Sequence, residues 1–314
     1  MSPELARHIA LDARLVEAVS GIRLLQAVSW PAREQQRFLE NFRRGEARLP
    51  QPEYRPIDLS AAREALASIR DTADPQHPLG QYLQRNAESW LHAAWLIEAA
   101  GSEAASWHSI QLFGRPGDAL PGSTYTNIDA ARHFIEIADE VSGALVPEDS
   151  EDVYSAEAMA AELQAALDAF FVGHRVRVEV DPELIAKAAA GPTRIRLRGG
   201  ATFSEYDLRQ LLEHEAFVHS LTALNGREQP HIRSLSRSAP RVTATQEGLA
   251  TFAELMTGAI DLPRLKRLSL RILAIDMALS GADFIEVFRF FLDSGQSEVE
   301  SFASAQQVFR GCPT

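Results

Sequence analysis

The stretch that most constrains this chain is residues 211–219, which places two histidines and two glutamates inside an apolar helical pattern. The capping box at residues 204–207 predicts where this helix begins, and the Asn-Gly pair at 225–226 predicts where it ends. Apolar residues recur between these limits with the spacing of a buried helix face, and that face includes Glu215 and His219. Because buried carboxylates and imidazoles are costly without partners, the pattern indicates a divalent metal site.

The spacing of the two histidines requires an irregular helix. The usual zinc-peptidase helix carries His-Glu-x-x-His, whereas this chain has His214-Glu215-x-x-x-His219. On a regular helix, residue i+5 lies about 140° round the axis from residue i, against about 40° for i+4. The two imidazoles can therefore share one ion only if the helix is locally widened, as by a π-bulge. The alternative is two separate histidines, each with its own hydrogen bond.

A second motif, the octapeptide TATQEGLA at residues 243–250, predicts the start of another helix. Thr243 and Gln246 have the spacing of a capping box, which places Glu247 in the first turn, where the helix dipole favours an anion. We expect the buried face of this helix to consist of the apolar residues Leu249, Phe252, Ala253 and Met256. Glu247 is a candidate third metal ligand, and His231, in the intervening loop, competes with it for that role. A glutamate that only favours the helix N-terminus is the alternative.

The two motifs together resemble the QEGLA-motif family of metallohydrolases, also called flavohaemoglobin expression-modulating QEGLA proteins. That family includes the microtubule-associated tyrosine carboxypeptidases of animals. The resemblance extends from about residue 112 to residue 311, most of the chain. It implies that His214, His219 and Glu247 bind one zinc ion per chain and that Glu215 is the general base.

The resemblance further implies a zincin-like metallopeptidase core and removal of a C-terminal residue, such as an aromatic one, from a peptide or protein. Glu215 favours this enzyme over the alternative, a non-catalytic regulatory or binding protein with a structural metal, because a structural site needs no base beside its ligands. Family members continue beyond the point that corresponds to Thr314. We therefore expect this early end to affect catalysis more than metal binding.

Several polar residues are candidates for contacts around the metal. Glu254 follows Glu247 on the same helix face, and we expect it to orient a metal ligand. A substrate carboxylate could be bound by side chains of the loop that joins the two motifs and of a later helix: Asn225, Arg227, Arg237, Arg241 and Arg271. The alternatives are a solvated basic loop and, for Arg271, a structural pair with Asp276.

The predicted fold class is α+β, mainly helical, with a small sheet that precedes the metal-binding helix. Residues 1–110 read as an N-terminal helical region and 111–314 as the zincin-like region, joined in one compact unit. Helical periodicity predicts helices at about 3–28, 32–44, 58–70, 79–100, 127–143, 156–172, 262–279, 283–293 and 297–309.

Two stretches alternate apolar and polar residues with the period of a strand, at 176–180 and 194–198. A short helix is predicted between them, from the Asp-Pro pair at 181–182 to residue 190. One strand edge could bind an extended peptide through its main chain, and a sheet that only packs against the helices is the alternative.

Charge and composition exclude several classes of function. The net charge of −12 argues against binding to nucleic acid or to an anionic membrane. A single cysteine, Cys312, allows no disulfide within the chain, which suits a reducing cytoplasm. The N-terminal residues lack the apolar core of a signal peptide, and no apolar run is long enough to span a membrane. We therefore expect a cytoplasmic protein.

Overall fold

The computed structural model describes residues 2–144, 154–184, 187–191 and 193–314. Helices dominate and the strands are few and short, so the predicted α+β, mainly helical class is confirmed. None of the helices in the described part of the chain combines the length and the apolar character that spanning a bilayer requires.

The chain forms two compact units that interleave along the sequence. The first unit comprises Met1–Val16 and Val141–Arg264, and the second comprises Glu17–Glu140 and Leu265–Thr314. The predicted boundary near residue 110 therefore falls inside the second unit.

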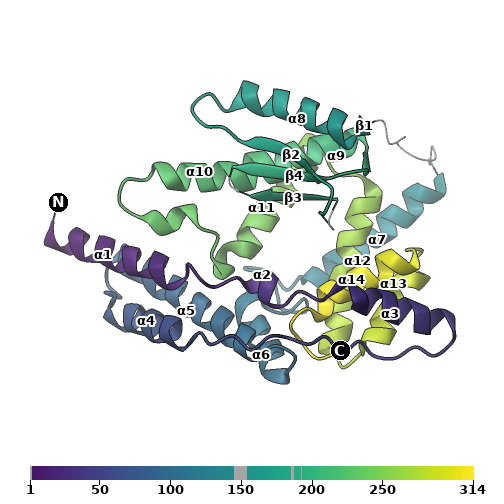
Figure 1. Cartoon of the computed structure of the whole chain (residues 1–314), viewed down its shortest axis with the longest axis horizontal. Helices are drawn as coiled ribbons and strands as arrows, with labels where there is room; N and C mark the ends of the chain where they lie inside the picture. The colour runs from purple at the N-terminus through teal and green to yellow at the C-terminus, as the bar shows by residue number, and fades with distance from the viewer. Residues whose placement is uncertain (1, 145–153, 185–186, 192) are drawn as a thin grey trace. The chain divides into compact units, whose positions relative to one another are not determined.

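The first unit contains the small sheets and the helix with the two histidines (Figure 1). Its elements are α1 (Pro3–Ala18, which ends in the second unit), β1 (Tyr154–Ser155), α8 (Ala156–Phe170), β2 (Arg177–Asp181), β3 (Ala188–Gly191), β4 (Arg194–Arg198), β5 (Thr202–Phe203), α9 (Glu205–Gln210), the π-helix η1 (Leu211–Ser220), α10 (Leu221–Glu228), the 3₁₀ turns η2 (Arg233–Ser236) and η3 (Pro240–Val242), and α11 (Thr243–Thr257).

The main sheet has the order β2-β4-β3, with β2 parallel and β3 antiparallel to β4. Helix α8 covers this sheet and buries Met159 and Leu163 together with Ile195 and Leu197 of β4. The strands β1 and β5 form a separate antiparallel pair. The edge strand β3 lies beside the π-helix, where the Ser220 hydroxyl donates to the carbonyl of Gly191 at 3.2 Å. The sheet thus supports the helix that carries the histidines.

A buried carboxylate of helix α1 bonds to a segment far along the chain in the first unit. Asp12 is fully buried and accepts hydrogen bonds from the backbone N–H groups of Arg233, at 2.6 Å, and Ser234, at 3.2 Å. It also accepts from the Ser234 hydroxyl. These three donors belong to η2, so Asp12 fixes the segment that joins the two sequence motifs.

The second unit is helical. Its elements are α2 (Leu24–Ala27), α3 (Ala32–Arg43), α4 (Ser60–Thr72), α5 (Pro78–Glu98), α6 (Glu103–Phe113), α7 (Asn127–Ala144), α12 (Leu262–Leu279, which begins in the first unit), α13 (Phe284–Asp293) and α14 (Glu298–Phe309). Aromatic rings dominate its core: Phe38 packs edge-on against Phe284 and Phe288, and Trp30 packs against Phe302. The predicted helices of this unit are confirmed except at the N-terminus.

One predicted helix is shorter than expected and another is wrong. The helix predicted at 3–28 ends at Ala18, and α2 is a separate short helix. The helix predicted at 182–190 is instead a turn followed by β3, although residues 185–186 lie outside the described part. Alanines favour helix, but pairing of Ala188 with Leu197 and of Ala190 with Ile195 places them in the sheet.

The helical segment that carries the two histidines does not end at the Asn225-Gly226 pair. It continues to Glu228, because Gly226 is an interior helix position that faces another part of the chain. A Cβ atom at Gly226 would overlap the backbone carbonyl of Leu235 in η2. Glycine is therefore required here for close packing and not for helix termination.

Candidate metal centre

The helix with the two histidines is a π-helix from Leu211 to Ser220, between the regular helices α9 and α10. In a π-helix each N–H bonds to the carbonyl five residues earlier, which brings residues five apart to the same side. His214 and His219 accordingly face one another, with ring centroids 4.9 Å apart and planes at 74°. The widened helix that the histidine spacing required is confirmed.

A carboxylate from α11 joins the two imidazoles. Oε2 of Glu247 lies 3.4 Å from Nε2 of His214, and Oε1 lies 3.6 Å from Nε2 of His219. One ligand atom of each of these three residues lies within 4.8 Å of the others. Of the two candidates for the third ligand, Glu247 lies beside the histidines, whereas His231 is not part of this cluster.

These separations suit a tetrahedral ion. Zinc ligands bind at about 2.0–2.2 Å, so two ligand atoms of a tetrahedral site lie roughly 3.3–3.6 Å apart. The distance from Nε2 of His214 to Oε2 of Glu247 is 3.4 Å, and the distance from Nε2 of His219 to Oε1 of the same carboxylate is 3.6 Å, so each imidazole lies at that spacing from a different oxygen. Two neutral nitrogens and one carboxylate oxygen, with a fourth position left for water or substrate, are also the donor set of a catalytic zinc site. The residues therefore fit zinc.

His214 is oriented by a chain of buried polar groups. Its Nδ1 donates to Oε1 of Glu254 at 2.5 Å, which leaves Nε2 directed toward Glu247. Glu254 has no exposed side-chain area, and Arg264 donates to both of its oxygens, at 2.6 and 2.7 Å. With its amide oxygen facing the guanidinium, Gln210 accepts from both terminal nitrogens of Arg264, at 3.0 and 3.1 Å. Glu254 thus contacts a histidine of the cluster, and its role in orienting a metal ligand stays a prediction.

Opposite charges within the cluster shift the pKa values of its histidine and glutamate side chains toward their ionised forms. Burial disfavours the imidazolium of His214, but its hydrogen bonds to Glu247 and Glu254 and the negative charge of Glu215 outweigh burial and raise its pKa to about 9. The hydrogen bond to His214 is the main cause of a lowered pKa of Glu247. Burial opposes ionisation of Glu254, yet its bonds to His214 and Arg264 lower its pKa. A metal ion would therefore displace a proton from His214, because only neutral imidazole binds metal.

Glu215 is partly exposed and follows His214 on the π-helix. It has no hydrogen bond or ion pair with any residue that the structure describes, while its charge acts on His214. A carboxylate that is close to the cluster but not engaged in it is available to a water molecule or a substrate.

The candidate substrate-binding residues lie at several places. Asn225, Arg227 and Arg237 are exposed, on α10 and directly after η2, and Arg241 is partly exposed in η3. Arg271 belongs to α12 in the second unit. Their role in binding a carboxylate stays a prediction.

Helix α11 differs from its predicted arrangement. It begins at Thr243 directly after the 3₁₀ turn η3, so Thr243 is already helical and forms no capping box, and Glu247 lies in the second turn. The face predicted to be buried is largely exposed: Leu249 by 50%, Phe252 by 57% and Met256 by 68%. The buried side carries Ala250 and Glu254. On that side Glu254 pairs with His214 and Arg264.

Sequence reasoning missed Arg264 and Gln210. Arg264 lies near the start of α12, where its backbone N–H is bound by Asp261 at 2.6 Å. In the sequence, Arg264 is a basic residue ten positions after Glu254, and residues at that spacing on one helix are not neighbours. The turn between α11 and α12 brings the two together, and no periodicity in the sequence predicts that turn.

A family model described as "Microtubule-associated tyrosine carboxypeptidase" matches residues 36–314, which include the whole candidate metal cluster. Comparison with curated proteins and with solved structures gives no match. The family match covers far more than half of the chain. The chain therefore belongs to the microtubule-associated tyrosine carboxypeptidase family.

Proposed function

We propose that the chain is a zinc-dependent carboxypeptidase with a zincin-like core. The observation that carries the proposal is the convergence of His214, His219 and Glu247 beside the unengaged carboxylate of Glu215. Membership of a family named for carboxypeptidase activity supports the reaction class. His214, His219 and Glu247 would hold the ion.

When bound, zinc would supply Lewis-acid chemistry, polarising the scissile carbonyl and lowering the pKa of water toward about 7. Glu215 would accept the proton of the attacking water and transfer it to the leaving amine. Its availability supports this role, since a base that is already bound to a protein cation would have to break that bond first.

Glu254 and Arg264 would hold His214 in place throughout the reaction. The hydrogen bond from Nδ1 to Glu254 fixes the imidazole tautomer that leaves Nε2 free. The two bonds from Arg264 keep Glu254 ionised and stationary. This arrangement would raise the basicity of His214 toward the ion and limit movement of its ring.

The substrate would be the C-terminus of a peptide or protein. The family's name points to tyrosine as the residue removed. Arg227, Arg237 and Arg241 are the candidates of this unit for binding the terminal carboxylate.

The test is release of C-terminal residues from a peptide library that varies only in its last position. The purified protein would be loaded with one equivalent of zinc, and products would be identified by mass spectrometry. We expect loss of a single terminal residue, fastest for aromatic ones, and no loss after removal of zinc with a chelator. Zinc binding without cleavage of any library member would instead favour a regulatory or binding protein with a structural metal.

A further inference from the structure

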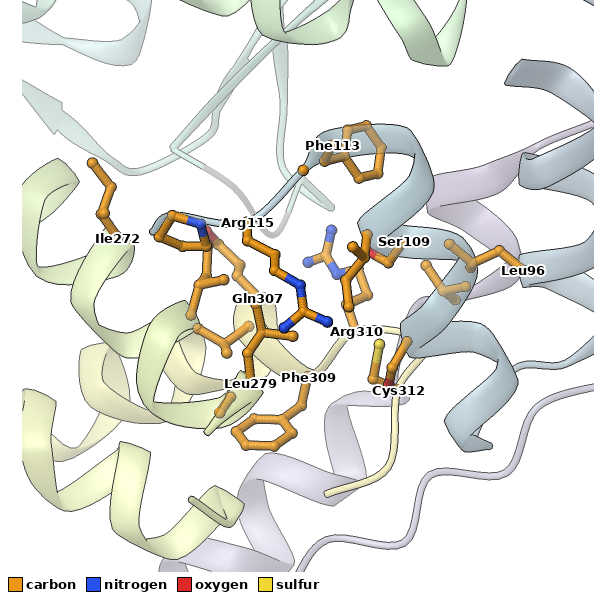
Figure 2. A pocket seen from close by; sticks show the side chains of 18 of the residues that line it. Leu96, Ser109, Phe113, Arg115, Ile272, Leu279, Gln307, Phe309, Arg310 and Cys312 are labelled. Atoms are coloured by element: carbon orange, nitrogen blue, oxygen red, sulfur yellow. The ribbon is translucent and has the colours of Figure 1, made fainter. Parts of the chain in front are cut away.

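The second unit contains a cavity of about 580 Å³. This volume lies within the range of about 300–1,000 Å³ that is typical of small-molecule sites. Residues of α2, α5, α6, α7, α12 and α14 and of the segments that follow α6 and α14 line it, and Figure 2 shows it from close by. All of the lining residues belong to the second unit, so the cavity shares no residue with the candidate metal centre.

Most of the wall is apolar and part of it is exposed to solvent. Leu96, Ile272 and Leu279 lie around the cavity (Figure 2). Leu25 is 69% exposed and Phe113 is 45% exposed, although both contribute to the wall. Exposed apolar surface is unfavourable in water, and an apolar ligand would cover it.

Two arginines extend into this apolar space. Arg115 follows α6 and Arg310 follows α14, and Figure 2 shows both guanidinium groups inside the cavity. Within the described residues, neither side chain has an ion pair or a hydrogen bond, and Nε of Arg310 is buried without a partner. A buried donor that lacks an acceptor is costly, and two like charges in one cavity add to that cost.

The chain has enough acidic residues to pair with Arg115 and Arg310, but none of those that the structure describes lines the cavity. The chain has 43 acidic residues against 31 basic ones, yet no aspartate or glutamate is among the described residues that line the cavity. Asp118 is close to Arg115 in sequence but does not line the cavity, and its carboxylate accepts a hydrogen bond from the backbone N–H of Arg115 at 2.8 Å. The other polar groups of the wall are neutral, such as Ser109 and Gln307. The cavity is therefore positively charged and apolar at once.

We infer that this cavity binds an amphipathic anion, a fatty carboxylate whose head is held by Arg115 and Arg310 and whose alkyl chain covers Leu25 and Phe113. Guanidinium groups bind carboxylates through two parallel hydrogen bonds, which the terminal nitrogens of Arg115 and Arg310 would donate. The alkyl chain would lie against the apolar wall. A neutral ligand of the same length would leave both arginines unpaired, and a short anion would leave the wall exposed.

The first experiment compares four ligands by isothermal titration: decanoate, decanol, acetate and decyltrimethylammonium. We expect decanoate to bind once per chain and at least about tenfold more tightly than the other three, because only it has both features. Equal affinity for decanol would overturn the role of the arginines. Equal affinity for acetate would overturn the role of the apolar wall.

The second experiment locates the bound ligand. Cys312 lines the cavity and is the chain's single cysteine, so its reaction with a thiol reagent reports on this site alone. Saturating decanoate should slow that reaction several-fold, and decyltrimethylammonium should not. An unchanged rate at full occupancy would show that decanoate binds elsewhere and would overturn the proposal.

Variants test the arginines directly. Arg115→Gln and Arg310→Gln should each weaken decanoate binding about 10–100-fold, as expected for loss of a charged hydrogen bond. Arg289→Gln is the matched control, because Arg289 is exposed on α13, does not line the cavity and should leave binding unchanged. Arg115 lies in an exposed loop, so its variant should fold even if Arg310→Gln does not. Full affinity in Arg115→Gln would contradict the proposal.

Discussion

The buried carboxylate of Glu254 accepts a hydrogen bond from Nδ1 of His214 at 2.5 Å, and Arg264 holds that carboxylate from its other side. Glu254→Gln keeps the size of the side chain but removes its charge, so it should weaken zinc binding about 10–100-fold. Competition with a chelator measures that affinity. Glu213→Gln is the control: Glu213 lies on the same π-helix and makes no hydrogen bond or ion pair with the described residues. Unaltered affinity in Glu254→Gln would show that Glu254 does not orient the ligand.

The assignment of ligands predicts zinc content. His214→Ala, His219→Ala and Glu247→Ala should each reduce zinc from about one ion per chain to a small fraction, because each removes one of three protein ligands. His231→Ala should retain full zinc, since His231 lies outside the cluster. Metal analysis after dialysis gives the answer. Full stoichiometry in both histidine variants of the cluster would contradict the assignment.

Gly226 and Gly248 both lie in helices, and we expect their substitution by alanine to have opposite effects on stability. A Cβ at Gly226 would overlap the backbone of Leu235, so Gly226→Ala should lower the free energy of unfolding by about 1–3 kcal/mol. A Cβ at Gly248 would meet nothing within 4 Å, so Gly248→Ala should raise it by up to about 1 kcal/mol. Denaturant unfolding of the two variants measures both values. A stable Gly226→Ala protein would disprove the close contact with η2.

The buried Asp12 should be essential to the stability of the first unit, although it lies outside residues 36–314, which match the family. Asp12→Ala leaves the two N–H groups and the hydroxyl of η2 without an acceptor, and we expect a loss of about 2–4 kcal/mol. Glu4→Ala, an exposed change on the same helix, should stay within about 0.5 kcal/mol of the parent. Thermal and denaturant unfolding compare them; equal losses would mean that Asp12 contributes no more than an exposed residue.

Local patterns in the sequence predicted much of the fold. The capping box at Ser204 and Asp207 formed as expected, because both partners lie within one turn. The π-helix was predicted for a chemical reason: His214 and His219 cannot share an ion on a regular helix. Strands β2 and β4 followed from alternation of apolar and polar residues.

The failures arose where distant parts of the chain decide the outcome. Ala188–Gly191 has a helical composition and becomes a strand because β4 offers it backbone partners. The Asn-Gly pair resembles a helix end, but Gly226 is a glycine because a side chain there would overlap the backbone of Leu235. Arg264 gave no signal, since its pairing with Glu254 depends on a turn between helices. Such contacts are tertiary, and periodicity within one helix does not contain them.

The most direct test of the proposed mechanism is the turnover number of Glu215→Gln, measured beside its zinc content and melting temperature. Glu215 neither belongs to the metal cluster nor pairs with a described residue, so the variant should keep the zinc and the stability of the parent. Loss of a positioned general base should reduce turnover about 10²–10⁴-fold on a peptide that the parent cleaves. A zinc-loaded Glu215→Gln protein that cleaves this peptide at the parental rate would contradict the account.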